Sequence, residues 1–379
     1  ERMDRRAAVN VFQGLIKGVS APLLVYLGFG VSGAVIGIVL SYLFAAPVGL
    51  LLAFFSSPRR ARVEMEPPDT WRSLRLMLAF GLPLFLGGLV AGFAGRLQGF
   101  LLSWFVSDEL IGNYGVAFRF TSLVNLVTES IGVTLFPAFS RFSYVVEPEK
   151  LREAFQGSVR YSAIIVLPLV LLLATVAKPA IYTLFTSKYP YAPLFFQLLL
   201  APMLLVGLGS LSIGNFLNSQ GDTTTSMRIT LLLSSVSILL SPILVWVWGV
   251  IGLVASIIVS GLAGNLLGFL VLRNKYRVSP ELEHSGRTLL CSAVSAASAY
   301  GVLWFLSDPT PLLRLFIGTA IFLTAFLLLA PLMGAIEGRD IGNLDLMLRD
   351  LKIIYPFARI LLDFEERLLL LTHGNSGKT

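Results

Sequence analysis

The run of residues 113–141, NYGVAFRFTSLVNLVTESIGVTLFPAFSR, constrains the fold more than any other stretch of the chain. It is apolar and long enough to cross a bilayer, since about 20 residues suffice at about 1.5 Å of rise each. The run nevertheless contains Arg119 and Glu129. Charges at the centre of a bilayer are costly, so they normally face a bundle interior or a wet cavity and mark a transport path. The run therefore predicts a transmembrane helix with a functional face.

The composition indicates a membrane protein with several spans. Of the 379 residues, 55% are hydrophobic and 13% charged, which is more apolar surface than one soluble core could bury. The net charge of +7 does not imply a nucleic-acid partner, because basic residues at the ends of apolar spans are what membrane topology requires. One cysteine, Cys291, and two histidines, His284 and His373, provide neither a disulfide framework nor a metal-ligand cluster. We expect no metal and no cofactor.

Hydrophobic runs bounded by charges, proline and glycine predict ten transmembrane helices. They cover approximately residues 8–28, 31–55, 76–106, 113–139, 161–185, 193–217, 229–248, 250–272, 288–306 and 312–334. If the odd-numbered helices run outward, almost all Lys and Arg residues of the connecting segments fall on the inner side, and the outer loops hold only Lys188. The positive-inside rule then predicts that both ends of the chain lie in the cytoplasm.

An internal repeat relates two of the predicted outer turns. The pattern G-V-x-G-x-V-x-x-I-x-x-S begins at Gly30 and again at Gly249, and each copy follows a span with a proline, Pro22 or Pro242. Small residues at such spacing also serve helix packing alone. If the second copy opens the sixth helix of a unit that begins near Trp71, the first copy opens the sixth helix of an earlier unit. Four helices would then be missing before residue 1.

Several short motifs resemble one family of membrane exporters. In the chain they read Phe80-Gly81-Leu82-Pro83-Leu84-Phe85-Leu86, Tyr114-x-Val116-Ala117-x-Arg119, Leu135-Phe136-Pro137-Ala138-x-Ser140-Arg141 and Asn215-x-x-Asn218-x-x-Gly221-Asp222-Thr223. The chain resembles the polysaccharide exporters of the multidrug/oligosaccharidyl-lipid/polysaccharide (MOP) exporter superfamily, which are relatives of the O-antigen and lipid II flippases. The resemblance covers roughly residues 1–275 well and 288–334 by position only. None of the motifs selects a substrate.

The resemblance implies an all-α polytopic fold of about ten transmembrane helices. Members have two six-helix lobes, commonly followed by two extra helices, and this chain is similar to helices 5 to 14 of that plan, with an N-terminal truncation. We therefore expect four parts. Residues 1–70 hold the last two helices of an incomplete N-terminal lobe and an inner loop, 71–275 a complete six-helix lobe, 276–334 the extra helix pair, and 335–379 an amphipathic cytoplasmic tail, with Pro356 interrupting it.

Charged residues inside the spans are the candidate substrate site. Measured along the helical rise from the predicted outer ends, Arg96, Arg119 and Lys178 lie at a common depth of roughly 9 to 12 Å, with Lys17 nearer the middle. Cations at one level suit the pyrophosphate of a lipid-linked sugar, because arginine presents paired donors that match phosphate oxygens. Glu129 lies about three turns deeper than Arg119. It either pairs with a cation of another helix or exchanges a proton or sodium ion.

Simpler interpretations exist for each of these residues. Lys178 and Arg314 lie near enough to helix ends for their charges to reach the interface. Arg96, Arg119 and Glu129 could form structural pairs between helices rather than line a cavity. Ser122, Asn125 and Glu129 share one side of their helix by spacing, which indicates either a wet wall or helix-to-helix hydrogen bonds.

Glycine and proline positions indicate where the helices break and move. They are Gly81-x-Pro83 with Gly87, Gly88, Gly92 and Gly95 in the third span, Pro168 in the fifth and Pro202 in the sixth. Proline removes an intrahelical hydrogen bond, and glycine lowers helix stiffness. Such breaks suit a lobe that bends during alternating access.

The pattern as a whole predicts a flippase and not an enzyme. A lipid-linked oligosaccharide would cross the cytoplasmic membrane of a prokaryote by alternating access, through a cavity lined by Arg96, Arg119, Asn125 and Glu129. Lys17 and Lys178 are further substrate-binding candidates. Expected partners are the lipid-linked sugar, membrane lipids and a polysaccharide polymerase or glycosyltransferases, with a proton or sodium gradient or the membrane potential as driving force.

Three alternatives stay open at this point. The nearest is a multidrug and toxin extruder of the same superfamily, whose sites favour carboxylates, whereas Glu129 is the only acidic residue inside a predicted span. A membrane enzyme of the same pathway would usually carry a long loop with acidic or histidine catalysts, but the longest loop here has about 20 residues. A purely structural membrane protein would not explain charges at one depth.

Overall fold

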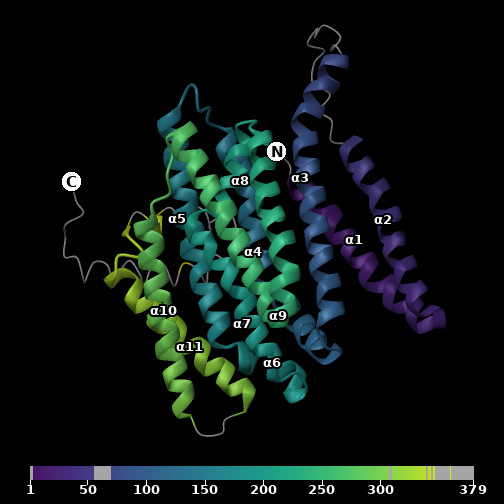
Figure 1. The fold of residues 1–379 in the computed structure, drawn as a ribbon, viewed down its shortest axis with the longest axis vertical. Coiled ribbons are helices and arrows are strands. Elements are labelled where there is room, and N and C mark those ends of the chain that lie inside the picture. Colours follow the sequence, from purple (N-terminus) through teal and green to yellow (C-terminus); the bar gives the residue numbers. More distant parts are fainter. Residues whose placement is uncertain are drawn as a thin grey trace. The chain divides into compact units, whose positions relative to one another are not determined.

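The computed structural model describes residues 3–54, 70–306, 310–338, 340–342, 345 and 359, and within these ranges the chain is helical with short connections (Figure 1). The predicted inner loop and nearly all of the predicted amphipathic tail, with Pro356, lie outside the described residues. The helices are α1 (Met3–Leu24), α2 (Gly30–Phe54), α3 (Thr70–Phe105), α4 (Asp108–Ser140), α5 (Pro148–Thr175), α6 (Ala177–Phe185), α7 (Ala192–Leu200), α8 (Ser210–Ser219), α9 (Thr223–Val271), α10 (Leu282–Phe305) and α11 (Pro311–Leu332).

Helices α4 and α5 begin well before their predicted starts. Helix α4 begins at Asp108, with Ser107 at the N-cap position and Asp108 and Glu109 in the first turn. Helix α5 begins at Pro148, with proline in its first turn. The predicted starts at 113 and 161 are wrong because hydropathy marks only the part of a helix that crosses the membrane. Acidic residues and proline at an N-terminus favour helix outside that part.

The described chain divides into two units, residues 1–73 and 74–379. The first unit contains the hairpin of α1 and α2, joined through the short π-helical stretch η1 (Val25–Phe29). The chain reverses at Gly30, whose φ of 52° and ψ of −135° lie in a region that only glycine adopts readily. A β-carbon at Gly37 would lie 2.5 Å from the Cα atom of Ala21. The small residues therefore let the two helices approach to backbone contact.

The second unit contains a hairpin with the same turn. Helix α9 is a single element by its hydrogen bonds, but it reverses at Gly249, with φ of 55° and ψ of −127°. The hydroxyls of Ser241 and Ser256 lie 2.9 Å apart across this hairpin, although a straight helix would separate them by about 22 Å. Gly30 and Gly249 are the first residues of the two repeat copies. The repeat therefore encodes one type of glycine turn, used twice.

Counting the spans requires these hairpins to be divided. By length and composition, seven helices of the described chain can cross a membrane, or eight if the bent pair Ala192–Leu208 and Ser210–Ser219 forms one span. Two of the seven, Ala8–Leu52 and Thr223–Tyr276, have 45 and 54 residues. Each is a hairpin and long enough for two crossings. If each hairpin crosses twice and the bent pair once, the described residues accommodate the ten spans expected from hydropathy.

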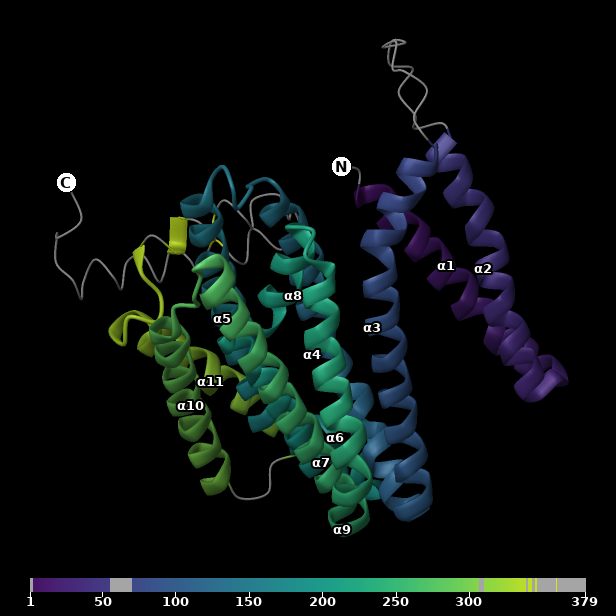
Figure 2. The same cartoon turned by 45° about the horizontal axis from the view of Figure 1, so that its top comes forward.

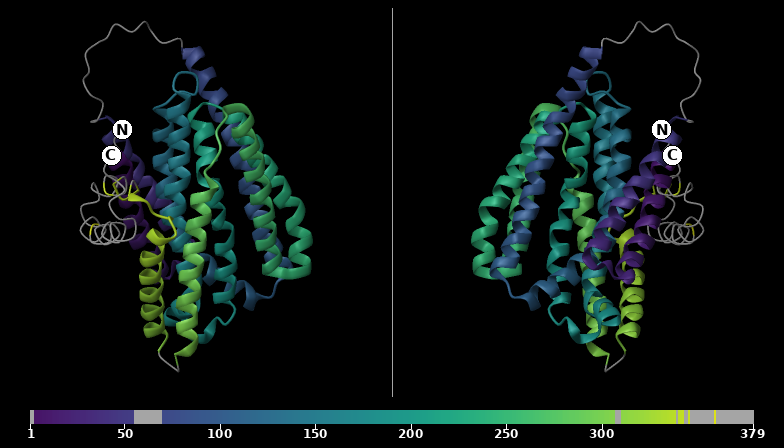
Figure 3. Two further views of the ribbon diagram at one scale, coloured as in Figure 1. Left: turned by 90° about the vertical axis from the view of Figure 1, so that its left-hand side faces the viewer. Right: turned by 90° about the vertical axis from the view of Figure 1, so that its right-hand side faces the viewer.

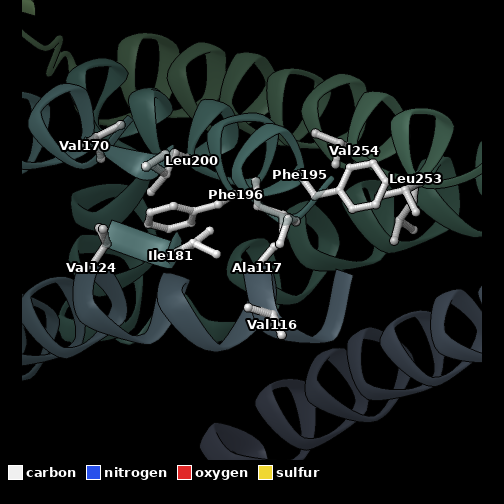
Figure 4. Close-up of a cluster of buried hydrophobic side chains, with 14 of the residues drawn as sticks. Val116, Ala117, Val124, Val170, Ile181, Phe195, Phe196, Leu200, Leu253 and Val254 are labelled. Atoms are coloured by element: carbon white, nitrogen blue, oxygen red, sulfur yellow. The ribbon is translucent and has the colours of Figure 1, made fainter. Parts of the chain in front are cut away.

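The core of the second unit joins α4, α5, α7 and α9. Figure 4 shows Phe196 among Val124, Ile181 and Leu200, and the ring of Phe195 beside Leu253 and Val254. Helix α4 packs against α5, α7 and α8, while α10 packs against α5 and α11 (Figure 2). Burial of large apolar side chains at these crossings supplies the main packing energy, and it fixes which face of each helix is left outward.

One of the predicted helix breaks is observed, and two are not. The chain around Pro202 forms the 3-10 helix η3 (Ala201–Leu208), and the helix axis then turns by 51° into α8. In contrast, α3 remains helical through Pro83 and α5 through Pro168. The predicted interruptions at these two prolines are wrong. A proline inside a membrane helix can be accommodated where neighbouring groups or small adjustments satisfy the freed carbonyl.

Candidate functional site

Helix α4 has a packed face and a charged outward face. Ala117, Val124 and Leu135 are buried in the lobe and lie on one side of the helix. At about 100° per residue, Arg119 and Glu129 lie at least about 120° away from the side that Ala117 defines. Both side chains are exposed. The two charges that interrupt this apolar run therefore lie outside the core of the lobe.

Helix α3 repeats this arrangement. Its packed face holds Ala94 and Leu101, and Arg96 is exposed on the opposite side. Helix α3 runs beside the first part of α9, where a β-carbon at Gly87 would lie 3.6 Å from the side chain of Thr230 (Figure 3). Only the two residues between Phe105 and Asp108 join α3 to α4. Two consecutive spans thus each present an arginine on the face that does not pack into the lobe.

The three charges have no partner within the described chain. Arg96, Arg119 and Glu129 form no hydrogen bond or ion pair with any described residue. Arg96 lies nine residues before the end of α3 and Arg119 eleven residues after the start of α4. These positions correspond to depths of roughly 14 and 16 Å along the helices. The earlier start of α4 therefore places Arg119 deeper than predicted, but still at nearly the level of Arg96.

The remaining predicted site residues are placed differently. Asn125 is half-buried on the flank of α4, and the neighbouring Ser122 hydroxyl donates to the carbonyl of Arg119. Lys178 is exposed on α6, with its ammonium 5.8 Å from the centre of the Tyr182 ring. Lys17 is exposed on α1, in the first unit. Within the second unit, the two arginines thus lie at nearly one depth on the consecutive helices α3 and α4. Lys178 lies on a different helix, α6.

A polar pocket of about 390 Å³ lies on the packed side of α3. Its polar lining comes from α3, α8 and both arms of α9, namely Gln98, Ser210, Ser234, Ser237, Ser260 and Asn265. The amide of Gln98 donates to the hydroxyl of Ser237 at 2.7 Å. The buried hydroxyl of Ser234 has no hydrogen-bond partner among the described residues. None of the predicted site residues lines this pocket, and it holds no charged side chain, so a phosphate would find no counter-charge there.

The turn between α8 and α9 holds three helix ends together. Asp222 caps α9 by accepting from the backbone N–H of Thr225, and it also accepts from the Lys275 ammonium at 2.6 Å and the Tyr276 hydroxyl at 3.0 Å. Partial burial alone would raise the pKa of the Asp222 carboxyl. The hydrogen bonds from Lys275, Thr225 and Tyr276 outweigh this, and the pKa lies below its usual value. Asp222, which belongs to a motif noted in the sequence, thus has a structural role: it connects the start of α9 to Lys275 and Tyr276.

A second structural contact between helices, from Asn113 to the start of α7, was not predicted. Asn113 is 1% exposed, and its side-chain oxygen accepts from the backbone N–H groups of Tyr191 and Ala192, both at 3.0 Å. These are groups at the start of α7 that lack a partner within their own helix. The partners are about 80 positions away in the sequence, so no local pattern could have revealed the contact.

This architecture defines an all-helical membrane protein with several spans. Two of its helical hairpins each reverse direction at a glycine. Residues 2–193 match the family described as polysaccharide biosynthesis protein, and residues 113–313 match the family of the lipid II flippase MurJ. Each match covers more than half of the chain. The chain belongs to these two families, and thus to the MOP exporter superfamily that its motifs resemble.

Individual proteins agree with this assignment. The chain is 21% identical over 230 residues to the probable low-salt glycan biosynthesis flippase Agl15 of Haloferax volcanii, covering 59% of this chain and 48% of that protein. It is 22% identical over 307 residues to the probable flippase AglR of the same organism, covering 80% and 62%.

A solved structure has a similar fold. The lipid II flippase MurJ in an inward closed conformation matches with a TM-score of 0.60 at 15% identity, covering 82% of this chain and 65% of that one. The chain therefore spans between about half and two thirds of the length of these three proteins. The likeness to MurJ supports the helical architecture described above.

Proposed function

We propose that the protein is a flippase that moves a lipid-linked oligosaccharide across the cytoplasmic membrane by alternating access. The observation that carries the proposal is the pair of unpartnered arginines, Arg96 and Arg119, on the outward faces of consecutive spans. A cation inside a span that pairs with nothing in its own lobe is costly unless it faces water or a ligand. Membership of families described by polysaccharide biosynthesis and lipid II flipping supports the same substrate class.

The chemistry of the site is electrostatic and not covalent. Each guanidinium offers parallel N–H donors that match two phosphate oxygens, and this preference does not depend on the sugar. Glu129, exposed on the same helix as Arg119, would exchange a proton or sodium ion as the head group arrives or leaves. No bond is made or broken, so the protein is not an enzyme. The membrane potential or an ion gradient would give the transport its direction.

The topology follows from the same proposal. Both ends would lie in the cytoplasm of a prokaryotic cell, where the positive-inside rule places the basic loops. Glycosyltransferases that load the lipid carrier would work on that side, and a polysaccharide polymerase on the other. No cofactor is needed.

The test is a transport assay with matched arginine variants. The purified protein is reconstituted in vesicles with a fluorescent lipid-linked oligosaccharide, and the fraction of label that an impermeant quencher reaches is followed over time. We expect Arg96→Gln and Arg119→Gln each to slow flipping at least tenfold. Arg228→Gln is the control, because Arg228 is also exposed on a helix without a partner in the described chain but lies near the inner end of α9. It should flip at the wild-type rate.

Two results would overturn the proposal. One is unchanged flipping in both arginine variants. The other is no lipid flipping by the wild-type protein together with sodium- or proton-driven uptake of an organic cation such as ethidium, which would indicate a multidrug and toxin extruder.

A further inference from the structure

Arg160 on α5 is the only lysine or arginine that is buried among the described residues, with 4% of its side chain exposed. From the sequence it appeared to belong to an inner connecting segment, because it lies before the apolar part of its span. The structure instead includes it in α5, between Val159 and Tyr161, where the helix faces α10. A guanidinium removed from water needs partners that replace its hydration.

Its partners come from two other elements. The Nη1 atom donates to Nε2 of His284, on α10, at 2.9 Å. The Nη2 atom donates to the carboxylate of Asp340 and lies 3.1 Å from a carboxylate oxygen of Glu337, both in the segment that follows α11. Asp340 is fully buried. One guanidinium thus connects α5 to α10 and to Glu337 and Asp340, and the contacting residues all lie more than a hundred positions after Arg160 in the sequence.

The segment after α11 is shaped to present these carboxylates. The backbone N–H of Ala335 bonds to the carbonyl of Ala330, which closes the end of α11. The Asp340 carboxylate accepts the backbone N–H of Glu337 at 2.8 Å, so it caps the next helical turn while it binds Arg160. Ile336 and Ile341 pack beside these residues into a small apolar cluster with Ile164 of α5.

The apolar cluster also holds these helices together. Taking an arginine and an aspartate out of water costs free energy that their mutual attraction often only offsets, and apolar replacements of similar volume are often as stable. An apolar contact is not directional, so its energy changes little when one helix slides along another. A guanidinium with three fixed acceptors holds one relative position of the helices.

The junction also has unused hydrogen-bonding capacity. Arg160 Nε, His284 Nδ1 and Asp340 Oδ1 are buried without a hydrogen-bond partner among the described residues. Buried polar groups are normally satisfied, so unpaired ones call for an explanation. The three side chains therefore hold their partners through their other polar atoms, namely the Nη atoms of Arg160, Nε2 of His284 and Oδ2 of Asp340.

We propose that Arg160 is a positioning residue that makes α10, α11 and residues 335–341 follow α5 as one body when the lobe changes conformation. This inference rests on the proposed function, because it assigns the junction a role during alternating access. The extra helix pair would otherwise be attached to the lobe only by contacts that tolerate sliding.

The test separates positioning from stability with a pair of variants. Arg160→Met removes the guanidinium and leaves Asp340 charged and buried. Arg160→Met with Asp340→Asn removes both charges, and the asparagine oxygen can still cap Glu337. Spin labels at Glu149 on α5 and Leu290 on α10, both exposed, report the distance between the two helices in lipid nanodiscs, with Cys291 replaced by alanine. Flipping and thermal unfolding are measured on the same preparations.

We expect the single variant to lose stability and flipping. The double variant should regain the unfolding temperature of the wild type, yet show a broader distribution of α5–α10 distances and flipping at least fivefold slower. If Arg160→Met does not fold, the double variant and Arg160→Lys carry the test. Arg160→Lys keeps one donor group, so the distance distribution should widen less.

A double variant with wild-type flipping and a narrow distance distribution would overturn the inference, since the junction would then serve stability only. Narrow distances in the single variant would do the same. Failure of the proposed function is distinguishable, because it appears as absence of flipping by the wild-type protein, whereas the distance measurement does not depend on the substrate.

Discussion

Arg119 and Arg160 are two arginines in neighbouring helices, α4 and α5, with opposite surroundings. Arg119 lies inside a span, exposed and without a partner in the described chain, whereas Arg160 lies near the start of its apolar run, buried and bound to Asp340, Glu337 and His284. A buried charge with several fixed acceptors holds parts of the protein in place. An exposed charge without a partner is available to something that the lobe does not contain.

The position of a charge along an apolar run therefore does not reveal its role. Hydropathy marks Arg119 as unusual and Arg160 as ordinary, yet Arg160 is the one that the fold has to satisfy internally. Four substitutions test this difference. Their expected losses of stability decrease in the order Asp340→Asn, Asn113→Ala, Asp222→Asn and Arg119→Gln.

Asp340→Asn should give the largest loss. The change removes the buried partner of Arg160 and leaves its guanidinium only the half-exposed carboxylate of Glu337, at a cost of about 3 kcal/mol in the free energy of unfolding. Denaturation of the detergent-solubilised protein followed by tryptophan fluorescence measures the change. Glu337→Gln is the control, since Glu337 is 42% exposed and water can replace much of its interaction. Equal losses in both variants would show that Arg160 does not depend on its buried partner.

Asn113→Ala should cost about 1 to 3 kcal/mol. The change removes the acceptor of the Tyr191 N–H and leaves the buried Ala192 N–H with only a longer bond to the carbonyl of Tyr189, at 3.3 Å. A buried donor that loses its better acceptor carries a penalty of that size. The same unfolding measurement applies, with exposed Asn274 replaced by alanine as the control. A loss as small as that of the control would mean that water reaches the start of α7 and satisfies both groups.

Sequence reasoning succeeded where the cause is local. The spans follow from apolar runs, and the hairpin turns at Gly30 and Gly249 follow from a glycine-led pattern whose backbone geometry, φ near 50° in both copies, excludes most other residues.

Sequence reasoning failed where partners are distant. No sequence pattern near Arg160 predicts that Asp340, 180 positions later, is buried against it. No pattern near Asn113 predicts that its side chain caps α7. The polar pocket was missed for the same reason, since its hydroxyls and amides come from three helices. Helix starts were misjudged because caps and acidic first turns lie outside the apolar runs.

Asp222→Asn should have a smaller effect that depends on pH. The pKa of the Asp222 carboxyl is lowered in the folded protein, so its ionised form contributes stability above the pKa of the unfolded chain, about 3.9. That contribution is lost as the pH falls through the lower pKa of the folded state. At pH 7 the variant should be less stable by about 1 kcal/mol, because asparagine can still cap α9 but loses the partly exposed ion pair with Lys275 and the charge-assisted hydrogen bond from Tyr276.

Unfolding temperatures of wild type and Asp222→Asn at pH 7 and pH 4 check this sign. The gap between them should narrow toward acid, because the wild type loses its advantage while asparagine does not titrate. A gap that widens toward acid would contradict the assigned hydrogen bonds. Lys275→Met is the partner variant, since it removes the 2.6 Å ion pair and leaves the cap to Thr225 in place. It should cost less than Asp222→Asn, because it also keeps the charge-assisted hydrogen bond from Tyr276 to Asp222.

Arg119→Gln should change stability least, by no more than about 0.5 kcal/mol, because the side chain is exposed and pairs with nothing in the described chain. The same variant is expected to lose flipping, so stability and transport would separate at this residue. In Asp340→Asn, stability and flipping should both decrease, because the buried ion pair stabilises the fold that transport requires. If Arg119→Gln instead destabilised the protein as strongly as Asp340→Asn, Arg119 would be a structural charge like Arg160. The contrast between the two arginines, and with it the case for an anionic substrate at α3 and α4, would then be lost.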